Sequence, residues 1–487
     1  MRARSDLEAI VGGGNVLDDA ATVEAYAGDH SFVAPVRPRC VVRPHEAAQV
    51  QQLVKWANDT STPLVPVSSG GPHFRGDTVP STGGGVVVDF SGMKRIRRVD
   101  AANWVAMVEP GVTYGELQAE LQKVGLTAYL PLAPRASKSV VGSMLEREPI
   151  TTPNYHWDAL DPMLCAEIVL GTGDMIRTGE AAGPDSTEEQ WEIGKAHMSP
   201  LGPGQYDQNR LISGAQGTIG LVTWATLKCR PLPDRASAFL VPSPALDPLL
   251  ELSHQVVKAR LGYHCFIVNA LNLACLAAQD SADIARLSKA LTRWILVLSV
   301  EGSGDLADDK VEYQVADFQD LVAANGLQAT EALEGIEAEA LRLALLAPSS
   351  EPYWKLRAKG AVQELFFLTT LDKTPRFVAA VDGLASAGEF PAGDIGVYLQ
   401  MTAQGTSCHC EFDFYYDPAK AADVDKTKRL AATSSEEVLK IGAFFSRPYG
   451  PWAKLAYGQA ATTTILHRKI KGIFDPSGIL NPGKLCF

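Results

Sequence analysis

Apolar and polar positions follow one another along the first half of the chain in a way that predicts a mixed order of helices and strands. Apolar residues recur at helical spacing in residues 45–58, and a β-branched run follows at 64–67, which predicts a helix and then a strand. The apolar stretches at 83–90 and 104–111 predict two more strands. Residues 115–125 have the pattern of an amphipathic helix that stops at a glycine.

Beyond residue 165 the pattern of apolar positions predicts further strands and then a second domain. Residues 165–179 predict two strands joined by a glycine-containing hairpin turn, and residues 217–233 predict one long strand that ends at prolines. Long helical patterns mixed with apolar strands between residues 236 and 430 indicate a second domain of α+β type. The helices expected beyond residue 236 cover residues 245–261, 283–300, 332–346, 434–445 and 461–474, and the strands cover 364–371 and 408–416.

Size and charge narrow the classes of protein. A chain of 487 residues predicts two or three domains, and a net charge of -12 offers no basic field for a phosphate backbone, so we expect no nucleic-acid partner. No stretch has the roughly 18 to 20 uninterrupted apolar residues of a membrane span. Asp6 and Glu8 interrupt the apolar run that a secretory signal requires, so we expect a cytoplasmic protein. The eight cysteines form no CxxC pair, so we expect neither a metal site nor a disulfide framework.

A glycine-rich turn, PVSSGGPHFRGD at residues 66–77, is the first candidate for chemistry. Gly70, Gly71 and Gly76 let the backbone approach a ligand closely, and successive free N–H groups in such a loop form an anion-binding nest. A diphosphate fits such a nest, although a tight structural turn has the same composition. No G-x-G-x-x-G opens a helix here, so the pattern is not that of a nicotinamide cofactor fold.

Four segments in one order carry a resemblance: residues 108–126, 139–148, 213–233 and the tail DPSGILNPGK at 475–484. Together they resemble the vanillyl-alcohol oxidase and p-cresol methylhydroxylase flavoprotein family (PCMH-type). The resemblance implies an α+β protein that binds FAD, with two α+β subdomains in the FAD-binding domain and an α+β cap domain over the flavin, and a dimer or higher oligomer. The domains implied are FAD-binding at 1–235, cap at 236–430, and a C-terminal segment at 431–487 that returns to the FAD-binding domain.

The resemblance also implies which residues hold FAD, mainly through backbone amides. The diphosphate is expected at Ser68, Ser69, Gly70, Gly71 and His73. The flavin is expected along the stretch that contains Ser139, Val140, Gly142 and Ser143, with Pro110 and Gly111 nearby. The adenine and ribose are expected at Gly217, Thr218, Ile219 and Gly220.

Candidate catalytic residues come from two further segments. SVVGSMLEREPITTPNYHWD resembles the stretch in which phenol-oxidising members carry a catalytic aspartate; His156 falls at that position and Asp158 lies two residues on. FFSRPYGPW matches the place where those members carry a tyrosine and an arginine that stabilise a phenolate. Arg447 matches the arginine, Ser446 replaces the tyrosine, and Tyr449 is expected to act instead. An arginine pairs with a phenolate or with a carboxylate, so it does not select between these substrates.

The mode of flavin attachment stays open between three readings. His409 falls on a strand from which some members of the family attach the flavin, and His73 follows the glycine turn from which related oxidases do so. A covalent link withdraws electron density and raises the flavin potential, which favours hydride removal from a poor donor. Noncovalent FAD is the third reading.

The leading hypothesis is oxidation of a para-substituted phenol or aromatic alcohol, with hydride leaving the benzylic carbon and a quinone methide forming. Arg447 and Tyr449 would hold the oxyanion, and His156 or Asp158 would manage the proton or water. A D-2-hydroxyacid dehydrogenase is the alternative, although no H-x-x-x-x-x-x-H pair for a metal lies near His409. A flavin-carrying subunit of a larger complex is the third. The electron acceptor is expected to be oxygen, a cytochrome or a quinone.

Overall fold

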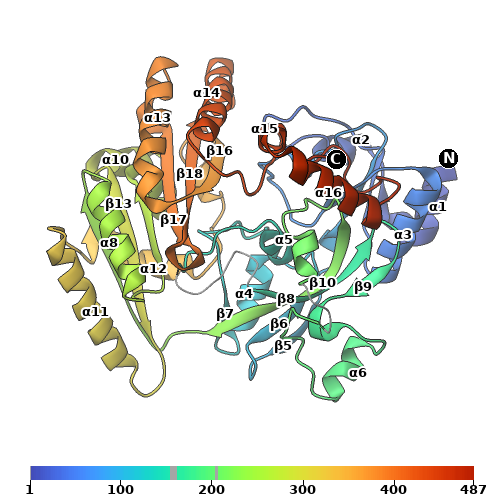
Figure 1. The fold of residues 1–487 in the computed structure, drawn as a ribbon, viewed down its shortest axis with the longest axis horizontal. Helices are drawn as coiled ribbons and strands as arrows, with labels where there is room; N and C mark the ends of the chain where they lie inside the picture. Colours follow the sequence, from blue (N-terminus) through green and yellow to red (C-terminus); the bar gives the residue numbers. More distant parts are fainter. Residues whose placement is uncertain (1, 154–161, 203–206) are drawn as a thin grey trace.

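The computed structural model describes residues 2–153, 162–202 and 207–487. Figure 1 shows two groups of elements, one that contains both chain ends and the first two sheets, and one that contains the third sheet with its helices. The strand β10 leads from the first group into the second.

The first sheet has four strands in the order β1-β2-β4-β3, and β4 is parallel to both of its neighbours. Its strands are β1 (Val16–Leu17), β2 (Cys40–Val42), β3 (Leu64–Val67) and β4 (Val86–Asp89). Its helices are α1 (Arg2–Val11), α2 (Ala20–Ala25) and α3 (Ala47–Thr60). The helix expected at 45–58 and the strands expected at 64–67 and 83–90 are confirmed. Apolar residues of α1, α3 and the sheet form one core.

The second sheet has six strands, with the path β5-β6-β10-β8-β9 and with β7 also paired to β10. The strands are β5 (Ile96–Asp100), β6 (Val105–Val108), β7 (Leu126–Ala128), β8 (Met163–Leu170), β9 (Met175–Arg177) and β10 (Gly220–Pro231). The helices are α4 (Tyr114–Gln122), α5 (Val140–Leu145), α6 (Thr187–Glu192) and α7 (Asn209–Ile212). The expected hairpin is confirmed, because β8 and β9 pair antiparallel.

The third sheet, here called the cap sheet, has the order β11-β13-β12-β17-β18-β16 and every pairing in it is antiparallel. The strands are β11 (Arg235–Ser243), β12 (Cys265–Asn269), β13 (Trp294–Gly302), β16 (Ala361–Thr369), β17 (Ile395–Thr402) and β18 (Ser407–Tyr416). Helices pack on both of its faces. One core contains α8 (Asp247–Lys258), α11 (Ala307–Ala324), α13 (Thr374–Ala387) and α14 (Ala421–Lys440), and the other contains α9 (Ala270–Ala277), α10 (Ser281–Ala290) and α12 (Ala338–Leu345).

Two helix predictions in this part were wrong in extent. The helix expected at 283–300 ends at Ala290, and the rest of the segment is strand β13. The apolar run WILVLSV is buried almost throughout, and such a run has the same pattern in a buried strand and a buried helix. The helix expected at 332–346 begins only at Ala338, after a two-strand hairpin of β14 (Ala332–Leu333) and β15 (Ile336–Glu337), since Gly335 adopts φ 86° and makes the turn.

The C-terminal residues run from the core of the cap sheet past the second sheet to the first sheet. Helices α15 (Pro451–Gln459) and α16 (Ala461–Phe474) come first, and α16 confirms the helix expected at 461–474. Leu480 then bridges Leu64 at the edge of the first sheet. The helix expected at 434–445 ends at Lys440, because Gly442 has φ 104° and Phe444 pairs with Leu368 of the cap sheet. Across the described ranges, no helix is both long enough and apolar enough to cross a bilayer.

Candidate functional site

Three glycine-bearing segments that are far apart in the sequence meet at the ends of the first two sheets. The backbone N–H of Ser139 donates to Ser69 Oγ at 2.8 Å. A Cβ at Gly142 would lie 2.8 Å from Ser68 Oγ, and a Cβ at Gly217 would lie 2.2 Å from Pro66 Cγ. Only residues without a side chain allow these approaches, so the turn after β3, the start of α5 and the turn before β10 form one surface.

That surface surrounds a cavity, here called the loop cavity. The residues expected to contact FAD that line it are Ser68, Pro110, Gly142, Gly217 and Gly220. Gly70 and Gly71 are exposed, and no atom lies within 4 Å of the Cβ that would be added at Gly71. The turn therefore leaves open space beside Gly71, where a ligand can approach the backbone.

Other expected contact residues support these loops from behind. Val140, Thr218 and Ile219 are buried, and Thr218 Oγ1 donates to the carbonyl of Ala215 at 2.7 Å. Gly111 is packed so closely that an added Cβ would lie 2.3 Å from the carbonyl oxygen of Phe90. Ser139 Oγ and Ser143 Oγ donate to Pro110 O at 2.6 Å and to Glu148 Oε2 at 2.5 Å, so these hydroxyls hold the loops in place.

The C-terminal tail ties the loops together. Lys484 Nζ donates to the carbonyls of Gly76 at 2.7 Å and Val79 at 2.6 Å. Asn481 Nδ2 donates to the carbonyls of Gln216 at 2.7 Å and Asp77 at 3.2 Å. Asn481 Oδ1 is buried, lines the loop cavity and has no partner within the described part of the chain. The sequence predicted that the tail matters but not which side chains act, because their partners are carbonyls elsewhere in the chain.

A second cavity, the interface cavity, lies between the loops of the first half of the chain and the cap sheet. Asp77 and Glu146 line both the loop cavity and the interface cavity, so the two adjoin. The titratable side chains that line the interface cavity come from both sides: His73, Arg75, Asp77, Arg135, Lys138, Glu146 and Glu148 from the first half, and Lys355, Glu364, Glu411 and Arg447 from the second. A long ligand could extend from one cavity into the other.

Arg75 joins the two sides of the interface cavity. Its Nη1 donates to Glu148 Oε1 at 2.8 Å and to Glu146 Oε2, and its Nε donates to Glu364 Oε2 at 3.3 Å. Burial alone would raise the pKa of Glu148, but Lys138 and Arg75 hold that pKa below its usual range. Burial, followed by the positive charges of Arg135 and Lys138, lowers the pKa of His73 to about 3, so its imidazole is neutral.

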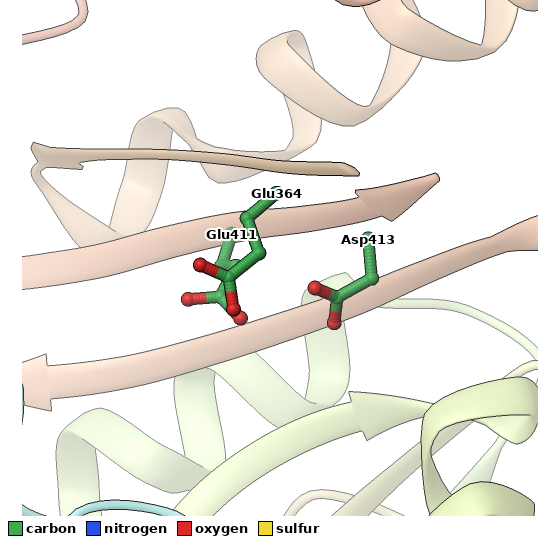
Figure 2. Close-up of side chains that lie close together, drawn as sticks. All are labelled: Glu364, Glu411 and Asp413. Atoms are coloured by element: carbon green, nitrogen blue, oxygen red, sulfur yellow. The ribbon is translucent and has the colours of Figure 1, made fainter. Parts of the chain in front are cut away.

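Figure 2 shows three carboxylates of the cap sheet close together: Glu364 from β16, and Glu411 and Asp413 from β18. Their oxygens lie near enough to bind a metal ion, but the ammonium of Lys355 takes the central place. Lys355 Nζ donates to Glu364 Oε1 at 2.7 Å, to Asp413 Oδ1 at 2.9 Å and to Glu411 Oε1. The group is an ion-pair cluster, and we call these four residues the Lys355 cluster.

Arg447 and Tyr449 both lie against Phe366. The guanidinium of Arg447 lies 4.1 Å from the ring centroid, and the Tyr449 ring lies edge-on at 6.1 Å. Arg447 is only 4% exposed, and its Nη1 has no hydrogen-bond partner among the residues described. Tyr449 is also buried but lines the loop cavity, so the two predicted residues do not face the same space.

Arg447 lines both the interface cavity and a third cavity, the side cavity. Its uncharged wall consists of Pro149, Ile150, Thr152, Leu368, Thr402, Ala403, Ser407 and Ser446. His409 lines the side cavity too, and its Nε2 lies 2.7 Å from Glu411 Oε2. Burial lowers the pKa of His409 despite this carboxylate. The predicted catalytic residues His156 and Asp158 lie outside the described residues.

Comparison with known proteins identifies the chemistry of this architecture. Residues 38–179 match the FAD binding domain family, and residues 269–485 match the family of C-terminal domains of FAD linked oxidases. The protein is an FAD-linked oxidoreductase. This confirms FAD as the cofactor and an enzyme of the oxidase or dehydrogenase type. The buried, unpartnered Asn481 Oδ1 and the open backbone at Gly71 in this oxidoreductase fit a bound dinucleotide.

Individual relatives of the oxidoreductase point in two directions. D-2-hydroxyglutarate dehydrogenase of Stutzerimonas stutzeri is 24% identical, with 99% of this chain and 98% of the relative covered. The flavoprotein subunit of 4-cresol dehydrogenase of Pseudomonas putida is 31% identical, over 42% of this chain and 40% of its own. The solved structure of p-cresol methylhydroxylase with substrate bound superposes with a TM-score of 0.85 at 20% identity, covering 100% of this chain and 96% of the other. The expected PCMH-type α+β fold is thereby confirmed.

Proposed function

We propose that this oxidoreductase oxidises a para-substituted phenol that binds as its phenolate at Arg447. One observation carries the proposal: Arg447 is buried, and its Nη1 has no partner in the described structure. A buried polar hydrogen without an acceptor costs about 1–3 kcal/mol, and more when the group is charged. An oxyanion in the cavity would supply the missing acceptor.

The surroundings of Arg447 support a ring-bearing anion. The side cavity beside it has walls from Pro149, Ile150 and Leu368, which suit an apolar ring. Phe366 covers the guanidinium on one face at 4.1 Å, so water has little access there and the charge acts through a medium of low polarity. A phenolate placed in this way combines a charge-assisted hydrogen bond with burial of its ring.

The same residues suggest how the chain assists the reaction. The bound FAD supplies the hydride acceptor. Arg447 holds the phenolic oxygen as an oxyanion, and the electron density of that oxygen weakens the benzylic C–H bond through the ring. Pro149, Ile150 and Leu368 exclude water from the ring, and Glu411 lines the adjoining interface cavity.

The two adjoining cavities support the proposed FAD contacts. The turn of Ser68, Ser69, Gly70 and Gly71 would hold the diphosphate through its exposed backbone. Pro110, Gly142, Gly217 and Gly220 would line the remainder of the dinucleotide in the loop cavity. The interface cavity, which adjoins at Asp77 and Glu146, would receive the isoalloxazine ring under the cap sheet.

A second candidate is oxidation of a D-2-hydroxy acid, with Arg447 as the clamp for the carboxylate. The full-length similarity to D-2-hydroxyglutarate dehydrogenase favours it. In the part of the chain that the structure describes, the group that could hold a metal is the three carboxylates of the Lys355 cluster, and Lys355 fills that place.

The test is anaerobic mixing of the FAD-loaded protein with 4-alkylphenols and with D-2-hydroxy acids, following loss of flavin absorbance. Reduction by 4-alkylphenols supports the phenol proposal, and reduction by hydroxy acids alone refutes it in favour of the second candidate. Arg447→Gln should abolish reduction at any accessible concentration of substrate. Arg342→Gln is the matched control, because Arg342 is also buried with an unpartnered Nη1 but lines neither the interface cavity nor the side cavity.

A further inference from the structure

The Lys355 cluster faces the interface cavity and contains three carboxylates but only one ammonium. Lys355, Glu364 and Glu411 line the cavity, whereas Asp413 lies behind them and is fully buried. The three carboxylates in Figure 2 share the single ammonium of Lys355. Arg75 also reaches Glu364, but it is shared with Glu146 and Glu148. A buried group with surplus negative charge favours uptake of a proton.

The geometry of the cluster provides a route for that proton. Lys355 Nζ hydrogen-bonds both to Glu411 Oε1, at the cavity wall, and to Asp413 Oδ1 at 2.9 Å. The second oxygen of Asp413 is occupied, because it accepts from Asn272 Nδ2 at 2.9 Å. Tyr415 fixes that amide in turn by donating to Asn272 Oδ1 at 2.9 Å. The oxygen of Asp413 left to take a proton is therefore the one that faces Lys355.

We propose that the Lys355 cluster takes up the proton that a phenol loses when it binds as a phenolate, and stores it on Asp413. The inference rests on the proposed phenol oxidation. The phenolic O–H bond breaks and its proton joins Glu411. Glu411 passes a proton to Lys355 while Lys355 passes one of its own to Asp413. The outcome is a phenolate at Arg447 and a neutral Asp413, with Glu411 and Lys355 restored, and no electron moves in this step.

The groups around the cluster leave Asp413 as the member that titrates near neutral pH. Burial first, and then Glu411 and Glu364, raise the pKa of Asp413 to about 7 against the opposing charge of Lys355. Burial lowers the pKa of His409, and the pKa values of the surrounding hydroxyl and thiol groups are raised by burial, so all of these are neutral. Those groups are Tyr353, Tyr398, Tyr415 and Cys275. The charged groups that face the cluster from other elements are Arg75, Glu148 and Arg447.

The experiment measures the number of protons released into solution for each phenolate that binds, and it does not depend on turnover. Phenol itself has no benzylic carbon to oxidise, so it can be mixed with the FAD-loaded protein in weakly buffered solution with a pH indicator. The phenolate band in the ultraviolet difference spectrum counts the bound anion. Near pH 8 Asp413 is ionised before phenol binds, and the negative charge of the bound phenolate raises its pKa further, so Asp413 takes up a proton and well under one proton should appear per phenolate. Near pH 6 Asp413 already carries a proton, so about one should appear.

Two variants test whether Asp413 is the residue that stores the proton. Asp413→Asn should release about one proton per phenolate near both pH values, because the storage site is gone. Asp382→Asn is the matched control; this carboxylate lies on α13 and pairs with Arg293 at the surface, so wild-type counts are expected. Wild-type release of a full proton near pH 8, with the phenolate band present, overturns the storage role alone. Absence of that band overturns the proposed function and the storage role with it. If Asp413→Asn does not fold, the wild-type comparison of the two pH values decides.

Discussion

Alanine substitutions at Gly71, in the turn after β3, and at Gly217, in the turn before β10, test separately for a role in FAD binding and a role in folding. Gly71→Ala adds a methyl group where no protein atom lies within 4 Å and where φ is not in the left-handed region. Gly217→Ala adds the same methyl at φ 69°, 2.2 Å from Pro66 Cγ. The two substitutions are chemically identical, so they serve as controls for one another.

The two substitutions are expected to destabilise different states: the flavin-free protein for Gly217→Ala and the FAD complex for Gly71→Ala. At Gly217 the left-handed backbone costs about 1–2 kcal/mol for a residue with a Cβ, and the overlap with Pro66 adds about 1–3 kcal/mol of overpacking. The apoprotein should lose about 2–5 kcal/mol of stability. At Gly71 the apoprotein should be unchanged, but the methyl occupies space proposed for the diphosphate. An overlap of about 1–3 kcal/mol in the complex corresponds to roughly 5- to 150-fold weaker FAD binding.

The assay has two parts. Thermal or urea unfolding of the flavin-free proteins reports the folding cost, and titration with FAD, followed by quenching of flavin fluorescence, reports the affinity. The reasoning predicts a stability loss for Gly217→Ala and an affinity loss at unchanged stability for Gly71→Ala. Wild-type FAD affinity in a well-folded Gly71→Ala protein would remove this turn from the proposed binding site.

Three further outcomes are expected. Between about pH 4 and pH 7 the contribution of Asp413 to stability should fall as pH rises, because native Asp413, with a pKa of about 7, holds a proton that the unfolded state has released. Comparison of Asp413→Asn with the wild type isolates this contribution from that of buried histidines such as His73 and His264, whose lowered pKa values act in the opposite direction. The variant should match the wild type in urea midpoint near pH 4 and exceed it near pH 8, and equal midpoints near pH 8 would contradict the assignment. Lys355→Met should cost about 3–5 kcal/mol in urea unfolding, since it leaves three buried carboxylates without their shared ammonium, and a cost under about 1 kcal/mol would show that the cluster relaxes. If a histidine holds the flavin covalently, acid precipitation of the wild type should give a yellow pellet. Replacement of that histidine, in His409→Ala or in His73→Ala, should then give a colourless pellet. A colourless wild-type pellet excludes both histidines.

Local patterns were enough for the elements whose neighbours are close in sequence. The hairpin of β8 and β9 and the helix α16 follow from residue spacing and turn chemistry, and the structure places them as expected. The close approaches at Gly142 and Gly217 also involve glycines that the sequence had singled out, because a position that tolerates no side chain is occupied by glycine. The run from Trp294 to Val300 was assigned wrongly, since an apolar segment buried on both faces has no periodicity that separates strand from helix.

The hydrogen bonds and ion pairs around the interface cavity and the loop cavity could not be found in the same way, because their partners are distant in the sequence. Arg75 and Glu364 are separated by 289 positions, and Gln216 and Asn481 by 265. Nothing local to either residue of such a pair predicts the other. The tail resemblance brought attention to the neighbourhood of Asn481, but only the packed structure shows which carbonyls its amide meets.

The sequence of strand β18 contained a signal for the Lys355 cluster, but it did not identify Lys355 as the partner of the carboxylates. His409, Glu411, Asp413 and Tyr415 alternate with Cys408, Cys410, Phe412 and Phe414, so the sequence shows one polar and one apolar face. A polar face on an antiparallel strand normally means solvent. Here helices pack on both faces of the cap sheet, and every one of these side chains is buried. Two charged residues on the same strand face, in a domain with helices enough to cover both faces, must be neutralised internally. Lys355 meets that requirement, and the remaining imbalance of charge is what makes Asp413 a proton acceptor.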